Sequence, residues 1–174
     1  MMVLRRRLVG SIALVHCSLT RVKSDVEHPQ PSPPPRGKPA IVSTWRFGAI
    51  AVGNAREILE AGGSSIDAVV SGVRAVELDD ADQYFVGVGG LPNADGVMEL
   101  DAAIMDDRRR YGAVMAIRDV KSPISVARVV MERSEHNIFA GEGALQFALE
   151  QGFRKEPDVL TQKAPPLFHP SHLM

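Results

Sequence analysis

Two neighbouring segments carry apolar residues at helical spacing. In the first, residues 52–61, the repeating apolar positions are Val52, Ala55, Ile58 and Leu59. The pair Gly62–Gly63 follows, and glycine is favoured just past the C-terminus of a helix. The second segment, residues 64–78, starts with a capping-box-like pair, Ser64 and Asp67. Its apolar positions are Ile66, Val69, Val70, Val73 and Val76. The spacing therefore predicts two consecutive helices.

Further along the chain, the pattern changes to one typical of strands. Val97–Asp106 alternates, with apolar residues on one side and Glu99 and Asp101 on the other. Tyr111–Ile117 is almost wholly apolar, as expected of a strand that is covered on both faces. Residues 106–110 between them are a charged, hairpin-like connection. Three more segments have the composition of strands: residues 40–44, 84–90 and 137–140.

Two more helices complete the pattern. Residues 122–133 begin with Ser122 as N-cap and Pro123 in the first turn, where a missing N–H has no cost. The last helix covers residues 141–151 and ends before Gly152. Helices and strands cluster along the chain rather than strictly alternating. This order favours an α+β layered domain over residues 40–155, rather than a doubly wound sheet.

Residues 1–39 and 156–174 are predicted to lie outside that domain. Six of the twelve prolines fall within residues 29–39, which indicates an extended linker, with a polyproline ligand as the alternative. The start of the chain has an arginine cluster followed by an apolar run over residues 8–15. It resembles a weak signal peptide, which would suggest a secretory or lysosomal protein. An organellar transit segment and a basic extension without address function stay open, so the compartment is unknown. The run is too short to span a membrane, which needs about 20 apolar residues.

Charge is unevenly distributed along the chain of 174 residues. The whole sequence has a formal charge of −1, with 20 basic and 21 acidic residues. Residues 1–40 hold seven basic and two acidic residues, which leaves 13 basic and 19 acidic residues for the rest. An acidic body lacks the electrostatic character of a nucleic-acid-binding protein. Cys17 is the only cysteine, so the body has neither an internal disulfide nor a cysteine nucleophile.

Several residue groups suggest chemistry, and each has a simpler interpretation. The Gly87–Gly90 segment could bind phosphate, but it lacks the spacing of known phosphate-binding loops, so tight backbone packing is predicted. Carboxylates cluster over Glu77–Asp82 and could bind a hard cation, although a solvated acidic loop is the preferred interpretation. Asp101 and Asp106 flank a strand and are expected to have structural roles. No metal site is predicted.

Trp45 is the one residue whose position suggests more than packing. It is the only tryptophan and lies at the predicted end of the first strand, before Arg46 and Phe47. A flat aromatic ring at such a place can stack on a sugar or form the wall of a ligand pocket, but from the residues alone core packing is the preferred interpretation. A serine–histidine pair at Ser134 and His136 lacks the context of a nucleophile and is interpreted as a surface feature of a helix end.

Six motifs occur in an order that resembles one known family. They are STW, EILEAGGSSIDAVVSGVRAVE, VGVGGLPNADGVMELDAAIMD, GAVMAI, KSPISVARVVME and NIFAGEGALQFALEQGF. Together they resemble the aspartylglucosaminidase and plant-type asparaginase family over residues 38–153. The nearer branch is the glycosylasparaginases, which are N4-(β-N-acetylglucosaminyl)-L-asparaginases. The plain L-asparaginases and isoaspartyl peptidases are the alternative.

The resemblance implies an N-terminal-nucleophile hydrolase, in which two sheets lie between two helical layers. In that family, self-cleavage before a threonine produces an α-chain and a β-chain, and the new N-terminal threonine attacks the substrate amide. By position, Trp45 corresponds to the tryptophan beside the substrate, and Gly89 and Gly90 belong to the glycine loop near the active site. No cofactor is implied. An asparagine-linked glycan or an asparagine-type molecule is the expected substrate.

The family's catalytic threonine has no counterpart among the three threonines of this sequence, Thr20, Thr44 and Thr161. None of them has the Gly-Asp-Thr-type context that the family's cleavage site requires. The expectation is therefore a partial αββα sandwich, an α-chain-like portion that is truncated before the nucleophile and inactive alone. Its unpaired strands suggest a partner, either a β-chain, a full-length relative or a second copy of the chain.

Overall fold

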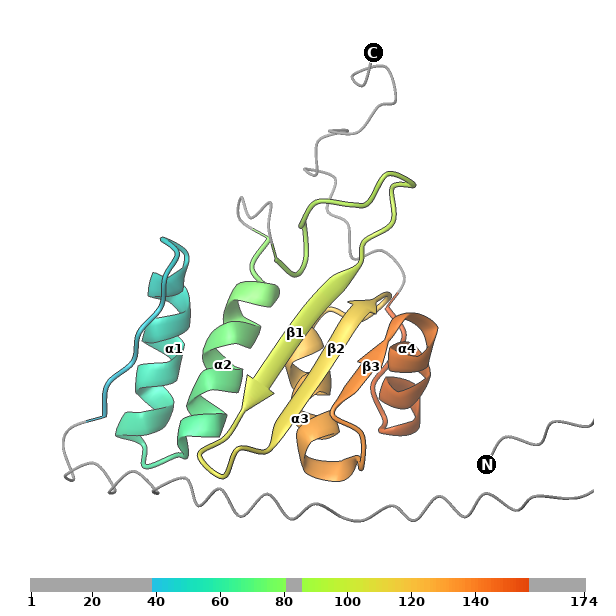
Figure 1. Cartoon of the computed structure of the whole chain (residues 1–174). Helices are drawn as coiled ribbons and strands as arrows, with labels where there is room; N and C mark the ends of the chain where they lie inside the picture. Colours follow the sequence, from blue (N-terminus) through green and yellow to red (C-terminus); the bar gives the residue numbers. More distant parts are fainter. Residues whose placement is uncertain (1–38, 81–85, 157–174) are drawn as a thin grey trace, which may run out of the picture. The chain divides into compact units, whose positions relative to one another are not determined.

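The computed structural model describes residues 39–80 and 86–156 of the chain. Within these ranges it contains four helices and one three-stranded sheet (Figure 1). In chain order they are α1 (Gly48–Glu60), α2 (Ser65–Glu77), β1 (Leu100–Met105), β2 (Tyr111–Ile117), α3 (Pro123–Arg133), β3 (Ile138–Ala140) and α4 (Gly141–Glu150). The predicted mixture of helices and strands is confirmed. The boundaries given to the last four elements from the sequence are correct to within one or two residues.

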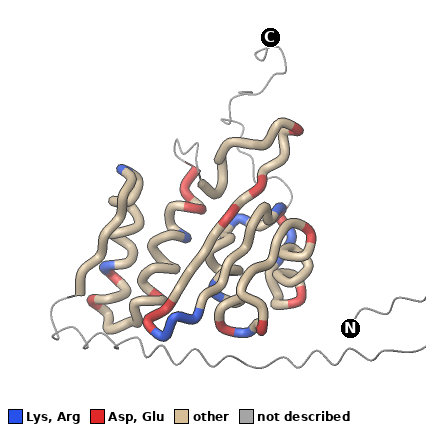
Figure 2. The backbone as a smooth tube through the Cα atoms, in the orientation of Figure 1, with Lys and Arg blue, Asp and Glu red and all other residues tan. Residues whose placement is uncertain are grey.

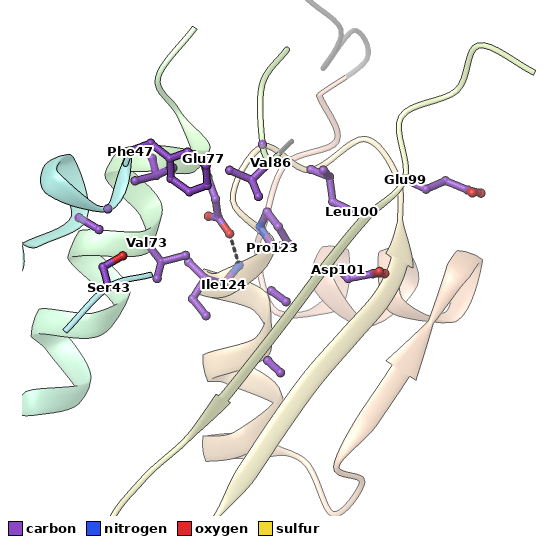
Figure 3. Close-up of a pocket in the computed structure, with 16 residues that line it drawn as sticks. Ser43, Phe47, Val73, Glu77, Val86, Glu99, Leu100, Asp101, Pro123 and Ile124 are labelled. Carbon is purple, nitrogen blue, oxygen red and sulfur yellow. Dashed lines mark hydrogen bonds between the residues drawn. The ribbon is translucent and has the colours of Figure 1, made fainter. Parts of the chain in front are cut away.

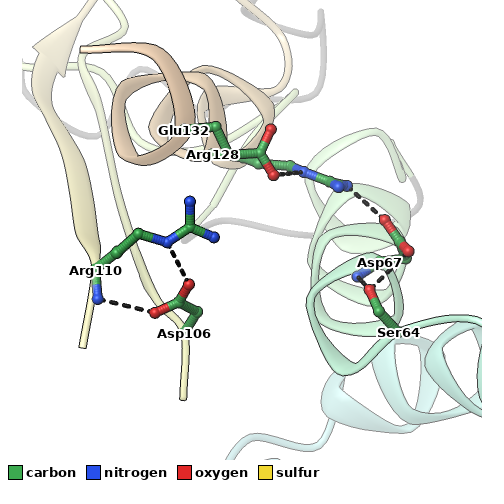
Figure 4. A network of polar contacts seen from close by, with 6 residues as sticks. All are labelled: Ser64, Asp67, Asp106, Arg110, Arg128 and Glu132. Atoms are coloured by element: carbon green, nitrogen blue, oxygen red, sulfur yellow. Dashed lines mark hydrogen bonds and ion pairs between the residues drawn. The ribbon is translucent and has the colours of Figure 1, made fainter. Parts of the chain in front are cut away.

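The sheet has the order β1-β2-β3. Strands β1 and β2 pair antiparallel through a tight turn, while β3 runs parallel to β2. Asp106 organises the turn, because its carboxylate accepts the backbone N–H groups of Arg108 and Arg110. It also forms an ion pair with the Arg110 side chain at 2.7 Å, and Figure 4 shows both contacts to Arg110. The basic residues that follow Asp106 gather at this turn (Figure 2). The structural role expected of Asp106 is confirmed.

Two of the predicted strands do not form in the described residues. Residues 40–44 form no strand; they run beside α1, and the α1 helix itself begins earlier than predicted, at Gly48 (Figure 1). Residues 86–90 form bends and a turn, while residues 81–85 lie outside the described part of the chain. Both predictions rested on residue composition. A strand also needs a neighbour that completes its hydrogen-bonding ladder, and neither segment pairs with the described sheet.

Helix α3 covers one face of the sheet and forms the core with it (Figure 1). Val114 and Ile117 of β2 and Val126 and Val130 of α3 are fully buried there. On the other face, three large apolar side chains remain exposed: Met105 at 61 %, Met115 at 51 % and Ile138 at 50 %. The expectation that β2 is covered on both faces is therefore wrong for the described residues, because its helical cover lies on one side.

A bulge in β2 gives Asp101 its structural role. The strand register changes between Leu100, which pairs with Ile117, and Ala102, which pairs with Val114. Between these two pairs, β2 has one residue more than β1. Ala116 lies in this stretch and has a φ of 48°, in the left-handed region. The Asp101 carboxylate accepts the Ala116 N–H at 2.7 Å and thereby satisfies a donor that the irregular ladder would leave unpaired. The structural role predicted for Asp101 is confirmed.

Helices α1 and α2 approach closely at Gly72. A Cβ atom at this position would lie 2.5 Å from the carbonyl oxygen of Ala51 and 3.3 Å from the Cβ of Ala55. The approach explains why small residues lie on this side of α2. The start of α2 is as predicted, since the Ser64 hydroxyl accepts the Asp67 N–H at 3.1 Å.

We expect Gly72→Ala to lower the free energy of unfolding by about 1 to 2 kcal/mol. Overpacking against the α1 backbone costs more than the roughly 1 kcal/mol that alanine contributes to an open helical position. Gly53→Ala is the matched control, because a Cβ there meets no atom within 4 Å, and it should stabilise the protein. Urea unfolding followed by circular dichroism measures both values. An equal gain in both variants would contradict the close packing at Gly72.

Candidate functional site

A cavity of about 470 Å³ lies between α1, α2, β1 and the start of α3 (Figure 3). Its wall is mainly apolar. It includes Phe47, which directly precedes α1, Val73 of α2 and Ile124 of α3. Three carboxylate residues also line it: Glu77, Glu99 and Asp101. An apolar hollow with a few polar groups is the form that small-molecule sites usually take, so this cavity is the candidate site.

Trp45 is close in the sequence to residues that line this cavity, but it is not itself a lining residue. Its side chain is 64 % exposed, and its ring stacks on Phe47 with 6.0 Å between ring centroids and 3° between ring planes. Phe47 and Ser43, on either side of Trp45 in the chain, do line the cavity. The preferred prediction from the residues, that Trp45 packs in the core, is therefore wrong. The ring is largely exposed, and its role in substrate binding stays a prediction.

The glycine turn, Gly87–Gly90, closes another side of the cavity through Gly87. Gly87 and Gly89 have φ values of 65° and 82°, in a region that glycine adopts without strain. The Gly90 N–H donates to the Gly87 carbonyl, which closes the turn at 3.1 Å. A Cβ on Gly87 would lie 2.1 Å from the carbonyl oxygen of Glu77. The predicted role of this segment in tight backbone packing is confirmed.

Glu77 is the buried charged residue of the described core, with only 3 % of its surface exposed. Its Oε1 accepts the Ile124 N–H at 2.9 Å (Figure 3). Its Oε2 accepts the Ser122 hydroxyl at 2.8 Å. Burial raises the pKa of this carboxyl to about 7, against the opposing effects of these two hydrogen bonds and of Arg74. Glu77 thus titrates near neutral pH.

The interpretation of Glu77–Asp82 as a solvated loop is wrong at its first residue. Glu77 ends α2 and points inward, while Asp79 is half-buried, Asp80 is exposed and residues 81–82 lie outside the described chain. A signal for this was present in the sequence. Val70, Val73 and Glu77 follow the helical spacing of the apolar stripe, so the pattern itself places Glu77 on the buried side of α2.

The other carboxylates of the cavity are engaged in structural contacts. Glu99 forms an ion pair with Arg118, which together with a hydrogen bond from Asn93 lowers the pKa of Glu99. Asp101 accepts the Ala116 N–H as described above. Among residues 39–80 and 86–156, no three histidine, aspartate or glutamate side chains gather in a way that could hold a metal ion.

The Ser134 and His136 pair forms the end of α3 instead of a catalytic pair. The Ser134 hydroxyl accepts the backbone N–H of His136 at 2.9 Å. The imidazole ring packs edge-on against Phe139, with 5.7 Å between ring centroids. These contacts stabilise the connection to β3 and agree with the surface interpretation made from the sequence.

The predicted substrate-binding residues are thus in two environments. Gly89 and Gly90 are buried in the glycine turn, and Trp45 is exposed before α1. The cavity is lined by their neighbours Gly87 and Phe47, and Trp45, Gly89 and Gly90 are not among its lining residues. The sequence reasoning did not identify Glu77 or Phe47 as residues of the candidate site.

Among the described helices, none combines the length and apolar character that a membrane span requires.

Comparison with known proteins gives consistent matches. Residues 39–165 match the family model described as asparaginase. The chain is 49 % identical over 132 residues to the N(4)-(Beta-N-acetylglucosaminyl)-L-asparaginase of Elizabethkingia miricola, covering 76 % of this chain and 38 % of that protein. It is 43 % identical over 101 residues to the isoaspartyl peptidase/L-asparaginase of Rattus norvegicus, covering 58 % of this chain and 30 % of that protein.

A third relative is similar over a stretch of comparable length. The plant-type L-asparaginase of Thermococcus kodakarensis is 45 % identical over 102 residues, which are 58 % of this chain and 32 % of that protein. The chain therefore spans about a third of the length of these relatives. The family model covers well over half of the chain, and the matched region contains every helix and strand of the described structure. This chain belongs to the asparaginase family of hydrolases.

Proposed function

We propose that the chain provides the α-chain-like portion of an amidohydrolase that cleaves the side-chain amide of glycosylated asparagine. The observation that carries this proposal is the 49 % identity, over 132 residues, to a protein named for that activity. The relatives named as isoaspartyl peptidases or L-asparaginases are less similar, at 43 % and 45 % over shorter stretches. Activity on free asparagine or isoaspartyl peptides is the alternative.

The proposed architecture is part of an αββα sandwich of the N-terminal-nucleophile type. It is supported by a sheet with helices on one face and exposed apolar side chains, Met105, Met115 and Ile138, on the other. A second sheet that packed on this face would bury those side chains, and two sheets packed face to face are a common arrangement. The exposed face is thus compatible with two inner sheet layers.

In this proposal, residues 1–174 by themselves hold no nucleophile. Thr44 is exposed in the segment before α1, and Thr20 and Thr161 lie outside the described residues. We therefore expect no hydrolysis of N4-(β-N-acetylglucosaminyl)-L-asparagine by the purified chain. The positive control is a hybrid protein in which residues 39–156 replace the matching part of the bacterial relative. This hybrid should hydrolyse the substrate. Turnover by residues 1–174 alone would contradict this part of the proposal, and an inactive but folded hybrid would contradict the assignment.

Trp45 is proposed to lie beside the sugar of the substrate, and Gly89 and Gly90 beside its asparagine moiety. An exposed, stacked indole ring can lie flat on a sugar face, which favours glycosylated substrates. In the hybrid we expect Trp45→Ala to lower kcat/KM for glycosylasparagine about tenfold, equivalent to roughly 1.4 kcal/mol, and to leave free asparagine nearly unaffected. Trp45→Phe should retain most of the activity. An equal loss on both substrates would contradict the contact with the sugar.

A second candidate function is that of a non-catalytic partner. The observation that favours it is the same exposed face, because Met105, Met115 and Ile138 together form an apolar surface on a monomer. The occupant would be a chain that carries the remaining part of a relative. Size-exclusion chromatography of residues 1–174 with that part of the bacterial relative should give a complex, and a Met105→Gln/Met115→Gln variant should weaken it. Failure of the unmodified chain to form a complex would contradict this candidate.

A further inference from the structure

Three segments of the chain meet at Glu77. Its side chain, at the C-terminal end of α2, binds the first turn of α3 through Ile124 and Ser122. Its backbone carbonyl accepts the Val88 N–H of the glycine turn at 2.8 Å. The Cα of Gly87 packs so close to Glu77 that no larger residue fits there. A single residue therefore joins α2, α3 and the glycine turn.

The Glu77 carboxyl replaces the cap that α3 would otherwise have. Ser122 is in the N-cap position, yet its hydroxyl makes no capping hydrogen bond to its own helix. The first N–H groups of a helix have no partner within the helix, so the Ile124 N–H needs an external acceptor. Glu77 supplies that acceptor from 47 residues away in the sequence. It also places its carboxyl at the positive end of the helix dipole.

We propose that Glu77 is the positioning residue of the candidate site and holds the glycine turn and the start of α3 in place. The link to substrate rests on the proposed function, in which Gly89 and Gly90 contact the asparagine moiety. The anchoring itself does not, because it follows from contacts within the chain. A change at both α3 and the glycine turn is the signature of this role.

The hydrogen-bond network is compatible with either protonation state of Glu77. The Ser122 hydroxyl is also 2.8 Å from the hydroxyl of Ser125, and either can donate to the other. If Glu77 is protonated, its Oε2–H can donate to Ser122, whose own proton then turns to Ser125, while Oε1 still accepts the Ile124 N–H. Glutamine can make the same set of contacts through its amide. Ser122 and Ser125 line a second hollow, so the network leads from the buried carboxyl toward the surface.

Several charged residues from the neighbouring elements lie around this hydrogen-bond network. Arg74 lies on the same helix as Glu77 and favours its charged form. The other charged residues that line the two hollows are Glu99 directly before β1, Asp101 on β1, Lys121 before α3, and Arg154 and Glu156 after α4. Glu99 pairs with Arg118 and Lys121 pairs with Glu156. Glu77 is the buried residue among these charged groups. A change with pH at this network can therefore be assigned to the Glu77 carboxyl.

Amide hydrogen exchange of the whole chain tests the anchor. In Glu77→Leu, which keeps side-chain bulk and removes both acceptors, the Ile124 amide should exchange at least tenfold faster relative to Val130. The Val88 amide should exchange at least threefold faster. Glu77→Gln should restore both to nearly the original protection, and Glu132→Gln, an exposed glutamate of α3, should change neither. Unchanged protection of Ile124 and Val88 in the leucine variant would overturn the proposal.

Two further measurements keep the test decisive. If the leucine variant does not fold, Ser122→Ala replaces it and should speed exchange at Ile124 about threefold, while unchanged exchange rejects the anchor. In the original chain, the amide signals of Val88 and Ile124 should shift with pH at one common midpoint near 7, and Glu77→Gln should abolish that shift. Separate midpoints reject the anchor. If the hybrid is inactive while the exchange rates change as expected, only the proposed function is rejected and the anchoring role of Glu77 is retained.

Discussion

Gly112→Ala should lower the free energy of unfolding by about 3 kcal/mol or more, because β2 and α3 leave no room for a side chain at this position. A Cβ at Gly112 would lie 2.2 Å from the carbonyl oxygen of Ala127 and 2.4 Å from the backbone nitrogen of Met131. Both atoms belong to the backbone of a packed helix, so no side-chain rotation relieves the contact. The helix would have to move away from the sheet and loosen the core around Val114 and Val126.

A matched control separates this contact from the general effect of alanine. Gly143 lies in α4, where a Cβ meets no atom within 4 Å, and Gly143→Ala should stabilise the protein by about 0.5 to 1 kcal/mol. Both values come from urea unfolding with the slope compared between variants. If Gly112→Ala unfolds at the same urea concentration as the original chain, then β2 and α3 are not as close as described.

Local sequence patterns predicted most of the elements correctly. The capping pair Ser64 and Asp67, the Ser122–Pro123 helix start and the alternation from Leu100 to Met105 each depend on neighbouring residues. Such signals can be read directly, since the interactions that produce them lie within one turn or one strand. The hairpin between β1 and β2 was predictable for the same reason.

The features that the sequence did not predict depend on distant partners. Residues 40–44 have the composition of a strand but lack a strand to pair with in the described sheet. Glu77 belongs to the carboxylate cluster that is interpreted as a solvated loop, and its partners Ser122 and Ile124 lie more than 40 residues away. A buried polar residue is stabilised by groups that only the fold brings together.

The candidate site shows the same division. The tight packing of Gly87–Gly90 follows from glycine itself, and the structure confirms it. The cavity, by contrast, takes its wall from four separate elements, and its lining residues Phe47 and Ile124 give no sign of that role in the sequence. Trp45, Gly89 and Gly90 were assigned from the resemblance to the family, and their contact with substrate stays a prediction.

Glu77→Gln should remove a large dependence of stability on pH. Burial raises the pKa of Glu77 from 4.5 to about 7, so the folded chain binds this proton more tightly than the unfolded chain. The stabilisation from the bound proton is fully present below pH 4.5 and is lost as the pH rises through 7. A shift of this size corresponds to about 3 kcal/mol, since each pKa unit is worth roughly 1.4 kcal/mol. The group is almost fully buried, so solvent screening reduces this value little.

The comparison of the two proteins across pH isolates Glu77 from the other carboxylates. The pKa values of Asp67, Glu99 and Asp106 are lowered, so these groups lose their stabilising contribution in the opposite direction, as the pH falls below 4. Their effect is common to both proteins and cancels in the difference. We therefore expect the original chain and Glu77→Gln to unfold at similar urea concentrations near pH 5, and Glu77→Gln to be more stable by up to about 3 kcal/mol at pH 8. A difference that is constant from pH 5 to pH 8 would mean that Glu77 does not titrate in this range, and that the hydroxyl network holds a charged carboxylate throughout.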